Sequence, residues 1–153
     1  MKKKLKLFGY FLLIILVLIQ FYPSEKPSVS FHNPNDLTIT EKVPNDIALK
    51  IKAACYDCHS NESKFPWYSN VAPTKWLVNN HIIEGREELN FSEWNAIETD
   101  DKSDLLDDIS SLVSDGEMPI KGYTLLHSEA KLSEADREAI ANWADDILDS
   151  LYE

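Results

Sequence analysis

The chain opens with a basic hexapeptide and continues with a long apolar run. Met1 to Lys6 contains four lysines, and the 18 residues from Leu7 to Ser24 carry no charge. As a helix rising about 1.5 Å per residue, this run would span about 27 Å, close to the thickness of a bilayer core. We expect residues 1–22 to form a signal-anchor or transmembrane helix. The alternatives are a cleaved signal peptide, which lacks its small-residue site here, and a buried core helix.

The distribution of lysines predicts how this helix is oriented. Four lysines precede the apolar run and one, Lys26, follows it closely. Basic residues favour the cytoplasmic side of a membrane. We therefore expect a single-pass protein of the cytoplasmic (inner) membrane, with everything after Pro23 in the periplasm.

Residues 23–43 show no sustained periodicity and contain three of the seven prolines, with Pro44 directly following. Such a composition is typical of a linker. Fully extended, the 22 residues from Pro23 to Pro44 reach about 70 Å at about 3.3 Å each, so we predict a tether that lets the domain stand off the membrane. Phe31, Leu37 and Ile39 are candidates for docking part of it on the domain.

From Asn45 onward the apolar residues recur with helical spacing, and no segment alternates as a strand would. The first predicted helix has its cap at Asn45 or Asp46. The second covers Lys75 to about Glu84 and ends near Gly85. The third starts at a Ser92 cap.

Two further helices complete the prediction. One presents an apolar face and stops at Gly116, and the last begins after a Ser133 cap and carries an i, i+3, i+4, i+7 apolar stripe. The stripe residues are Ile140, Trp143, Ala144, Ile147, Leu148 and Leu151. We therefore predict a small all-α domain over residues 44–153.

The charge of the chain excludes one class of function. Its 15 Lys and Arg against 26 Asp and Glu give −11, and residues 27–153 alone carry ten basic and 25 acidic side chains. A nucleic-acid binder is not expected from such a surface. The acidity instead favours a partner protein with a basic docking face.

Both cysteines fall in one pentapeptide, Cys55-Tyr56-Asp57-Cys58-His59. This C-x-x-C-H spacing is the signature of covalent haem attachment, in which the two thiols bond the porphyrin and the histidine binds the iron. The sequence therefore predicts one covalent haem c, with His59 as proximal ligand. A zinc site would need two more ligands, a thioredoxin-like dithiol needs a βαβ setting, and a disulfide would leave His59 unexplained.

A sixth iron ligand must come from few candidates. Apart from Met1, the only methionine is Met118, which lies beside Pro119 between two predicted helices. Met118 is the predicted distal ligand, with His81 and then His127 as less favoured choices and His32 the weakest. Met118 would otherwise be a gap-filling core residue. The aromatic residues near Trp67 and Tyr68 would either wall the haem or simply pack the core.

Several of these pieces together resemble a known family, the small haem-binding domain proteins of bacterial envelopes, which are related to c-type cytochromes. The matching pieces are Cys55-Tyr56-Asp57-Cys58-His59-Ser60, Pro66-Trp67-Tyr68-Ser69-Asn70 with Ala72-Pro73, His81, Glu84-Gly85-Arg86, Asn90-Phe91-Ser92-Glu93-Trp94, Gly116-Glu117-Met118-Pro119, Tyr123, His127, and Leu132-Ser133 leading into the helix of Trp143. The resemblance covers about residues 44–150. It implies haem on Cys55 and Cys58 with His59 proximal, and a cytochrome c-like fold in which the first and last helices of the domain cross.

These features predict a membrane-anchored mono-haem electron carrier rather than an enzyme. A haem sensor or ligand-binding module with an open or displaceable sixth position is the alternative. A peroxidase is less favoured, because His81 with Arg86 is the one weak candidate for a distal pair. A structural or interaction module without haem is the remaining hypothesis.

Overall fold

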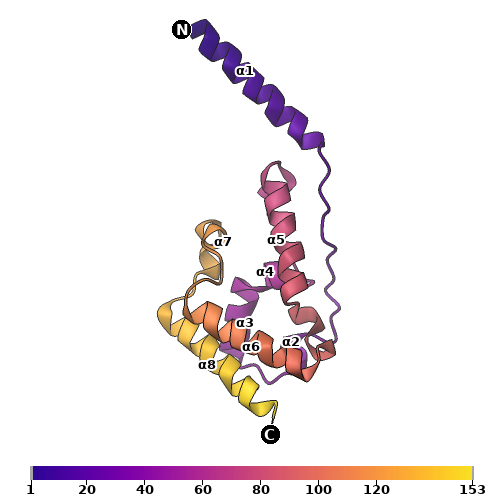
Figure 1. Cartoon of the computed structure of the whole chain (residues 1–153), viewed down its shortest axis with the longest axis vertical. Coiled ribbons are helices and arrows are strands. Elements are labelled where there is room, and N and C mark those ends of the chain that lie inside the picture. The colour runs from indigo at the N-terminus through magenta and orange to yellow at the C-terminus, as the bar shows by residue number, and fades with distance from the viewer. Residues whose placement is uncertain (1, 153) are drawn as a thin grey trace.

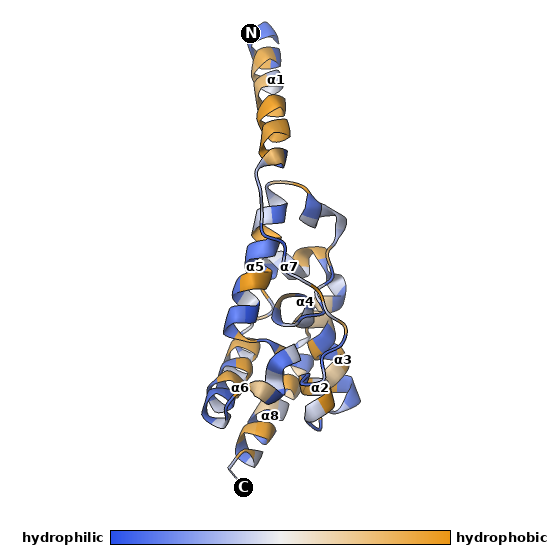
Figure 2. Ribbon diagram, turned by 90° about the vertical axis from the view of Figure 1, so that its right-hand side faces the viewer, coloured by the Kyte–Doolittle hydropathy of each residue, from blue (hydrophilic) through white to orange (hydrophobic). Residues whose placement is uncertain are grey.

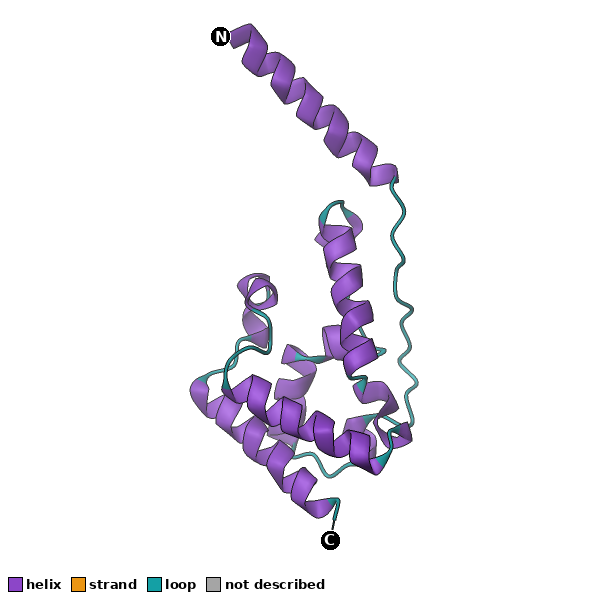
Figure 3. Cartoon of the chain, viewed as in Figure 1, coloured by secondary structure: helices purple, strands orange, loops and turns teal. Residues whose placement is uncertain are grey.

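The computed structural model describes residues 2–152, which fold into helices joined by loops, with no strand among them (Figures 1 and 3). The all-α prediction is therefore confirmed. The longer helices are α1 (Lys2–Leu18), α3 (Asn45–Ala54), α5 (Thr74–Glu88), α6 (Thr99–Ser114) and α8 (Glu134–Ser150). The short ones are α2 (Leu37–Thr40), α4 (Tyr56–His59) and α7 (Lys121–Leu126). Short 3₁₀ turns cover Ile19–Phe21, Trp67–Asn70, Phe91–Ala96 and Ser128–Ala130.

Helix α1 stands apart from the rest of the molecule as one apolar rod (Figure 2). With the following 3₁₀ turn it runs from Lys2 to Phe21, has a mean hydropathy of 2.0 and buries none of its residues. A helix of 20 residues is about 30 Å long, which matches a bilayer core. By length and composition α1 is able to cross a membrane.

The core of the domain is built where α6 packs along α8, with α3 against α8. Helix α8 begins as predicted, because Ser133 and Asp136 form a reciprocal capping box. Its apolar stripe buries Ile140, Trp143 and Ala144 against Leu106 of α6. The residues that α3 contributes to the same cluster are Ile47 and Ile51.

Three predicted helix boundaries were wrong. Pro44 occupies the N-cap position of α3, where its fixed φ suits the chain entering a helix. Asn90, not Ser92, caps the Phe91–Ala96 turn, since its side chain accepts a hydrogen bond from the Ser92 N–H. Helix α5 continues through Gly85 to Glu88, because this glycine faces a neighbouring backbone rather than ending the helix.

The segment between α1 and α3 lies along the domain instead of extending freely from it. The Asn79 amide donates to Ser24 Oγ (2.9 Å), and Arg86 Nη1 donates to the Ser28 carbonyl (2.8 Å). Further on, Leu37 is completely buried, so this docking candidate is confirmed. Phe31 and Ile39, by contrast, are largely exposed. The segment that was expected to hold the domain away from the membrane as a free tether is thus attached to the domain.

We expect Leu106→Ala to lower the free energy of unfolding by about 2 to 5 kcal/mol, because it leaves a cavity at the centre of the α6–α8 contact. Leu106 is 0% exposed and Leu49 on α3 is 70% exposed. The matched control Leu49→Ala should change the free energy by less than about 0.5 kcal/mol. Thermal unfolding of the full chain in mild detergent measures both, and equal effects would show that this contact is not the core.

Candidate functional site

A largely apolar cavity of about 460 Å³ opens between the α3–α4 turn, α5, α6 and the loop before α7. Its wall brings Cys55, Cys58 and His59 together with His81 and Met118, which lie much farther along the chain. The apolar residues around them are Ile51, Ala54, Leu89, Phe91, Leu105, Ile109, Leu112, Val113, Pro119, Ile120 and Ile140. The cavity is of the size and character of a cofactor pocket.

The two cysteines reach this wall because the chain turns sharply between α3 and α4. The Cys55 N–H still closes α3 by donating to the Ile51 carbonyl (2.9 Å), and the Cys55 carbonyl accepts from the N–H groups of Cys58 (3.1 Å) and His59 (2.9 Å). Cys55 and Cys58 form no disulfide in the described chain. Both thiols therefore remain available to a ligand in the cavity.

Burial keeps these thiols protonated. It raises the pKa of Cys55 to about 12, with a smaller contribution from Cys58, and the pKa of Cys58 to about 11. A redox dithiol or a zinc site needs thiolates at neutral pH. In residues 2–152 no group of three or more His, Cys, Asp or Glu side chains is placed to hold a metal ion. The site thus does not favour either alternative.

Helix α5 lies unusually close to the cysteine turn. A Cβ on Gly85 would stand 2.9 Å from the Cys58 carbonyl oxygen, nearer than side chains tolerate. The next residue, Arg86, donates from Nε to the Ser60 carbonyl (2.8 Å) and from Nη2 to Ser63 Oγ (2.9 Å). Gly85 and Arg86 together fix the position of the turn at the cavity wall.

The imidazole of His59 is oriented by a hydrogen bond to the Leu89 carbonyl. Its Nδ1 lies 3.2 Å from the carbonyl oxygen of Leu89, so a proton on Nδ1 leaves Nε2 as the unprotonated nitrogen. Burial, partly offset by hydrogen bonds to the Leu89 and Gly85 carbonyls, lowers the pKa of His59. A neutral ring with a hydrogen-bonded Nδ1 is the form in which histidine binds iron.

Met118 is held at the cavity by its backbone. Gly116 takes a positive φ of 73° after α6, which returns the chain so that the Met118 N–H donates to the Leu112 carbonyl (3.0 Å). From α8, Arg137 Nη1 donates to the carbonyls of both Met118 (2.7 Å) and Val113 (2.9 Å). The half-buried Met118 side chain packs against the core beside the cavity.

Sequence reasoning gave Arg137 no role and Arg86 only a weak one as a possible distal partner of His81. One feature of the sequence could have drawn attention to these two residues, because they are the only arginines in the chain. Each spans a gap between elements by donating to main-chain carbonyls, a task that suits the forked guanidinium.

The histidine candidates are placed very differently. His81 is half-buried on the cavity wall. His127 does not line the cavity and has both ring nitrogens engaged, with Tyr68 Oη at 2.6 Å from Nε2 and Glu129 at 3.2 Å from Nδ1. Its ring also stacks on Tyr123, with centroids 4.2 Å apart. His127 is therefore not positioned as a ligand for this cavity, and His32 is exposed away from it.

The aromatic residues also differ in whether they line the cavity. Phe91 lines the cavity and Trp94 is buried in the core, whereas the Trp67 side chain is 79% exposed. Tyr68 is hydrogen-bonded to His127 and does not line the cavity. The aromatic wall expected around a haem thus reduces to Phe91, with Tyr123 at the rim.

A match to a protein family indicates which cofactor the chain binds. The haem-binding domain family matches residues 14–146, which is most of the chain. The chain belongs to the haem-binding domain family. The predicted family resemblance and the prediction of haem as cofactor are thereby confirmed. No curated protein and no solved structure matches the chain.

The residues present fit such a cofactor. An apolar cavity suits the faces of a porphyrin, and its wall offers two protonated thiols, a neutral imidazole and a thioether. These are the donor types found around protein-bound haem iron and its vinyl groups. Carboxylates at the rim, Glu84, Glu88 and Asp108, lie in the exposed part of the lining.

We expect Gly85→Ala to reduce haem content and to destabilise the domain by about 1 to 3 kcal/mol, because the added methyl group pushes α5 away from the Cys58 carbonyl. Gly122 in α7 is the matched control, since a Cβ there meets nothing within 4 Å. Gly122→Ala should keep full haem content. A pyridine haemochrome assay and a thermal melt test the pair; normal haem content in Gly85→Ala would contradict the role of this close approach.

Proposed function

We propose that this protein is a membrane-anchored c-type haem protein that carries electrons on the extracytoplasmic side of the membrane. One observation carries the proposal: Cys55, Cys58, His59 and Met118 line a single apolar cavity. Haem binding follows from the family, and covalent attachment, single-haem stoichiometry and axial ligation are the proposed refinements.

In this proposal each residue has a distinct task. Cys55 and Cys58 hold the haem through thioether bonds, and His59 presents Nε2 to the iron while Leu89 fixes its ring. Met118, whose carbonyl accepts a hydrogen bond from Arg137, would supply a second ligand to the iron. When bound, the haem supplies a one-electron couple. The apolar residues of α6 exclude water from it, and a thioether ligand favours a relatively positive potential.

The placement of α1 supports an anchored protein. We propose three parts, a transmembrane helix over residues 1–22, a connecting segment over residues 23–43 and the haem domain over residues 44–153. Since haem c is attached outside the cytoplasm, the lysine-rich N-terminus on the cytoplasmic side agrees with the position of the cysteines. The acidic surface would recruit a donor or acceptor protein with a basic face.

A haem sensor with a displaceable sixth ligand is the second candidate, and one observation favours it. His81 lines the same cavity as Met118, so the chain offers two possible sixth ligands. A peroxidase finds less support, because Arg86 is engaged with Ser60, Ser28 and Ser63 rather than paired with His81.

An optical spectrum and a pyridine haemochrome assay on the full chain, expressed with haem c maturation, test the proposal. Thioether-linked haem with a low-spin ferrous state that resists CO supports the carrier. High-spin haem that binds CO at once would shift the assignment to the sensor. A protein that loses its haem to acid–acetone extraction would contradict covalent attachment.

Replacing the proposed distal ligand should give a specific spectral change. We expect Met118→Ala to lose the methionine–iron absorption band and to bind CO, because the sixth position opens. His81→Ala removes the other candidate from the same cavity and should leave the band intact. The opposite pattern would assign the sixth position to His81.

Arg137 is predicted to act as a positioning residue for Met118. We expect Arg137→Met to destabilise the domain by about 1.5 to 3 kcal/mol, since two carbonyls lose a charged donor. It should also weaken the methionine–iron band and lower the reduction potential. Arg137→Lys, which keeps a charged donor, should partly restore both. Destabilisation with an unchanged band and potential would show a purely structural role.

A further inference from the structure

One end of the domain faces α1 and differs from the rest of the surface (Figure 1). It consists of residues 66–80, which form the Trp67–Asn70 turn and the first half of α5, and residues 119–126, which contain α7; we call it the proximal face. Large apolar side chains are exposed on these segments: Trp67 by 79%, Val71 by 44%, Leu125 by 79% and Leu126 by 65%.

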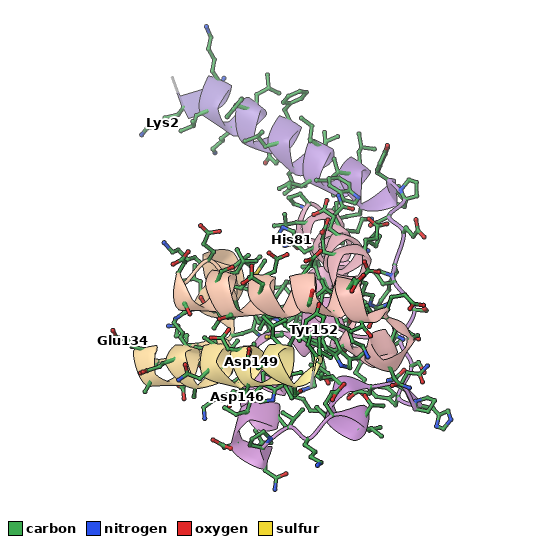
Figure 4. All side chains as sticks on the ribbon, turned by 60° about the horizontal axis from the view of Figure 1, so that its bottom comes forward. Lys2, His81, Glu134, Asp146, Asp149 and Tyr152 are labelled. Atoms are coloured by element: carbon green, nitrogen blue, oxygen red, sulfur yellow. The ribbon has the colours of Figure 1, made fainter. Side chains whose placement is uncertain are left out.

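The proximal face also lacks negative charge. Neither segment contains an Asp or Glu, although the chain has 26 of them, and their charged residues are Lys75 and Lys121. The nearest carboxylate with a hydrogen bond to the face is that of Asp57, which accepts from Tyr123 Oη (2.8 Å), whereas Asp146 and Asp149 on α8 lie on the side away from α1 (Figure 4). Exposed apolar groups without carboxylates are what a surface rich in anionic lipid headgroups accepts.

The proximal face is joined directly to the Ile19–Phe21 turn and Tyr22, which follow α1. The Gln20 side chain bonds both backbone groups of Ala72, accepting from its N–H (2.8 Å) and donating to its carbonyl (3.1 Å). Lys75 Nζ donates to the Gln20 carbonyl (2.9 Å), and Tyr22 meets Trp76 edge to face, with ring centroids 5.7 Å apart. The end of the apolar helix and the start of α5 are thus held together without a linker.

We propose that the proximal face rests on the bilayer that α1 spans, with Trp67, Leu125 and Leu126 inserted among the lipid headgroups. This rests on the membrane anchor of the proposed function. Because Gln20 and Tyr22 lie where α1 ends, the residues bonded to them lie at the membrane surface. Tryptophan is favoured at this level, and leucines on a short helix gain from burial in the outer acyl region.

The cavity lies next to this face. Pro119, Ile120 and Tyr123 belong to both the cavity wall and the proximal face, and His81 directly follows the first half of α5. Figure 4 shows His81 toward the α1 side of the domain. Docking on the bilayer therefore holds the haem site close to the membrane surface.

Lipid photo-crosslinking tests the docking. The haem-loaded full chain is reconstituted in vesicles of phosphatidylcholine and phosphatidylglycerol, with Leu125→p-benzoylphenylalanine in one sample and Leu49→p-benzoylphenylalanine in another. Leu49 is the matched control, because it is 70% exposed but lies on α3, outside the proximal face. After illumination and mass spectrometry, we expect the lipid adduct at position 125 to exceed that at position 49 several-fold.

The outcomes separate the two proposals. Chains that fail to float with the vesicles would overturn the anchor and the docking together. Chains that float but give equal lipid adducts at the two positions, or crosslink position 125 to protein, would overturn the docking alone.

A second experiment places the crosslinker at Trp67 and adds Leu125→Glu and Leu126→Glu. We expect the lipid adduct at position 67 to fall several-fold while the haem spectrum stays unchanged, and an unchanged adduct would contradict the proposal.

Discussion

The structure depends on the close contact between α5 and the turn that carries both cysteines. Within five residues of α5 and its end, Gly85 lies against the Cys58 carbonyl, Arg86 holds Ser60, and the Leu89 carbonyl meets His59 Nδ1. Each contact positions a different residue of the haem-binding sequence. Because Gly85 has no side chain, the two backbones approach closely enough for the other two contacts to form.

The part of the cavity wall that contains Met118 is positioned in a different way. There α6 and α8 pack against each other, and Met118 lies on the loop that follows α6 after Gly116. Arg137 connects this loop to α8 through the carbonyls of Val113 and Met118, so the position of the thioether is tied to the best-packed part of the domain. One part of the wall is thus positioned by the absence of a side chain at Gly85, and another part by the long, charged side chain of Arg137.

Much of this was open to prediction from sequence because it depends on local pattern. The stripe and capping box of α8, the apolar anchor and the five-residue motif are all encoded within short windows. The α4–α5 contact was not predictable, since Gly85 and Cys58 are distant in sequence and a glycine in a helical pattern equally suggests a helix end. The docking of residues 23–43 was predicted correctly only at Leu37, because the rest relies on hydrogen bonds such as Arg86 to the Ser28 carbonyl, which leave no periodic signal.

The contact between Gln20 and Ala72 has a kinetic consequence. A domain on a long flexible linker would move through a thick layer of solution above the membrane. A domain held at the end of its membrane helix would move mainly in the plane of the membrane. Confinement raises the effective concentration of partners that share the membrane plane, and it lowers encounters with soluble ones. In the proposed membrane-docked arrangement, the two hydrogen bonds between Gln20 and Ala72 would favour partners in the membrane plane over soluble ones.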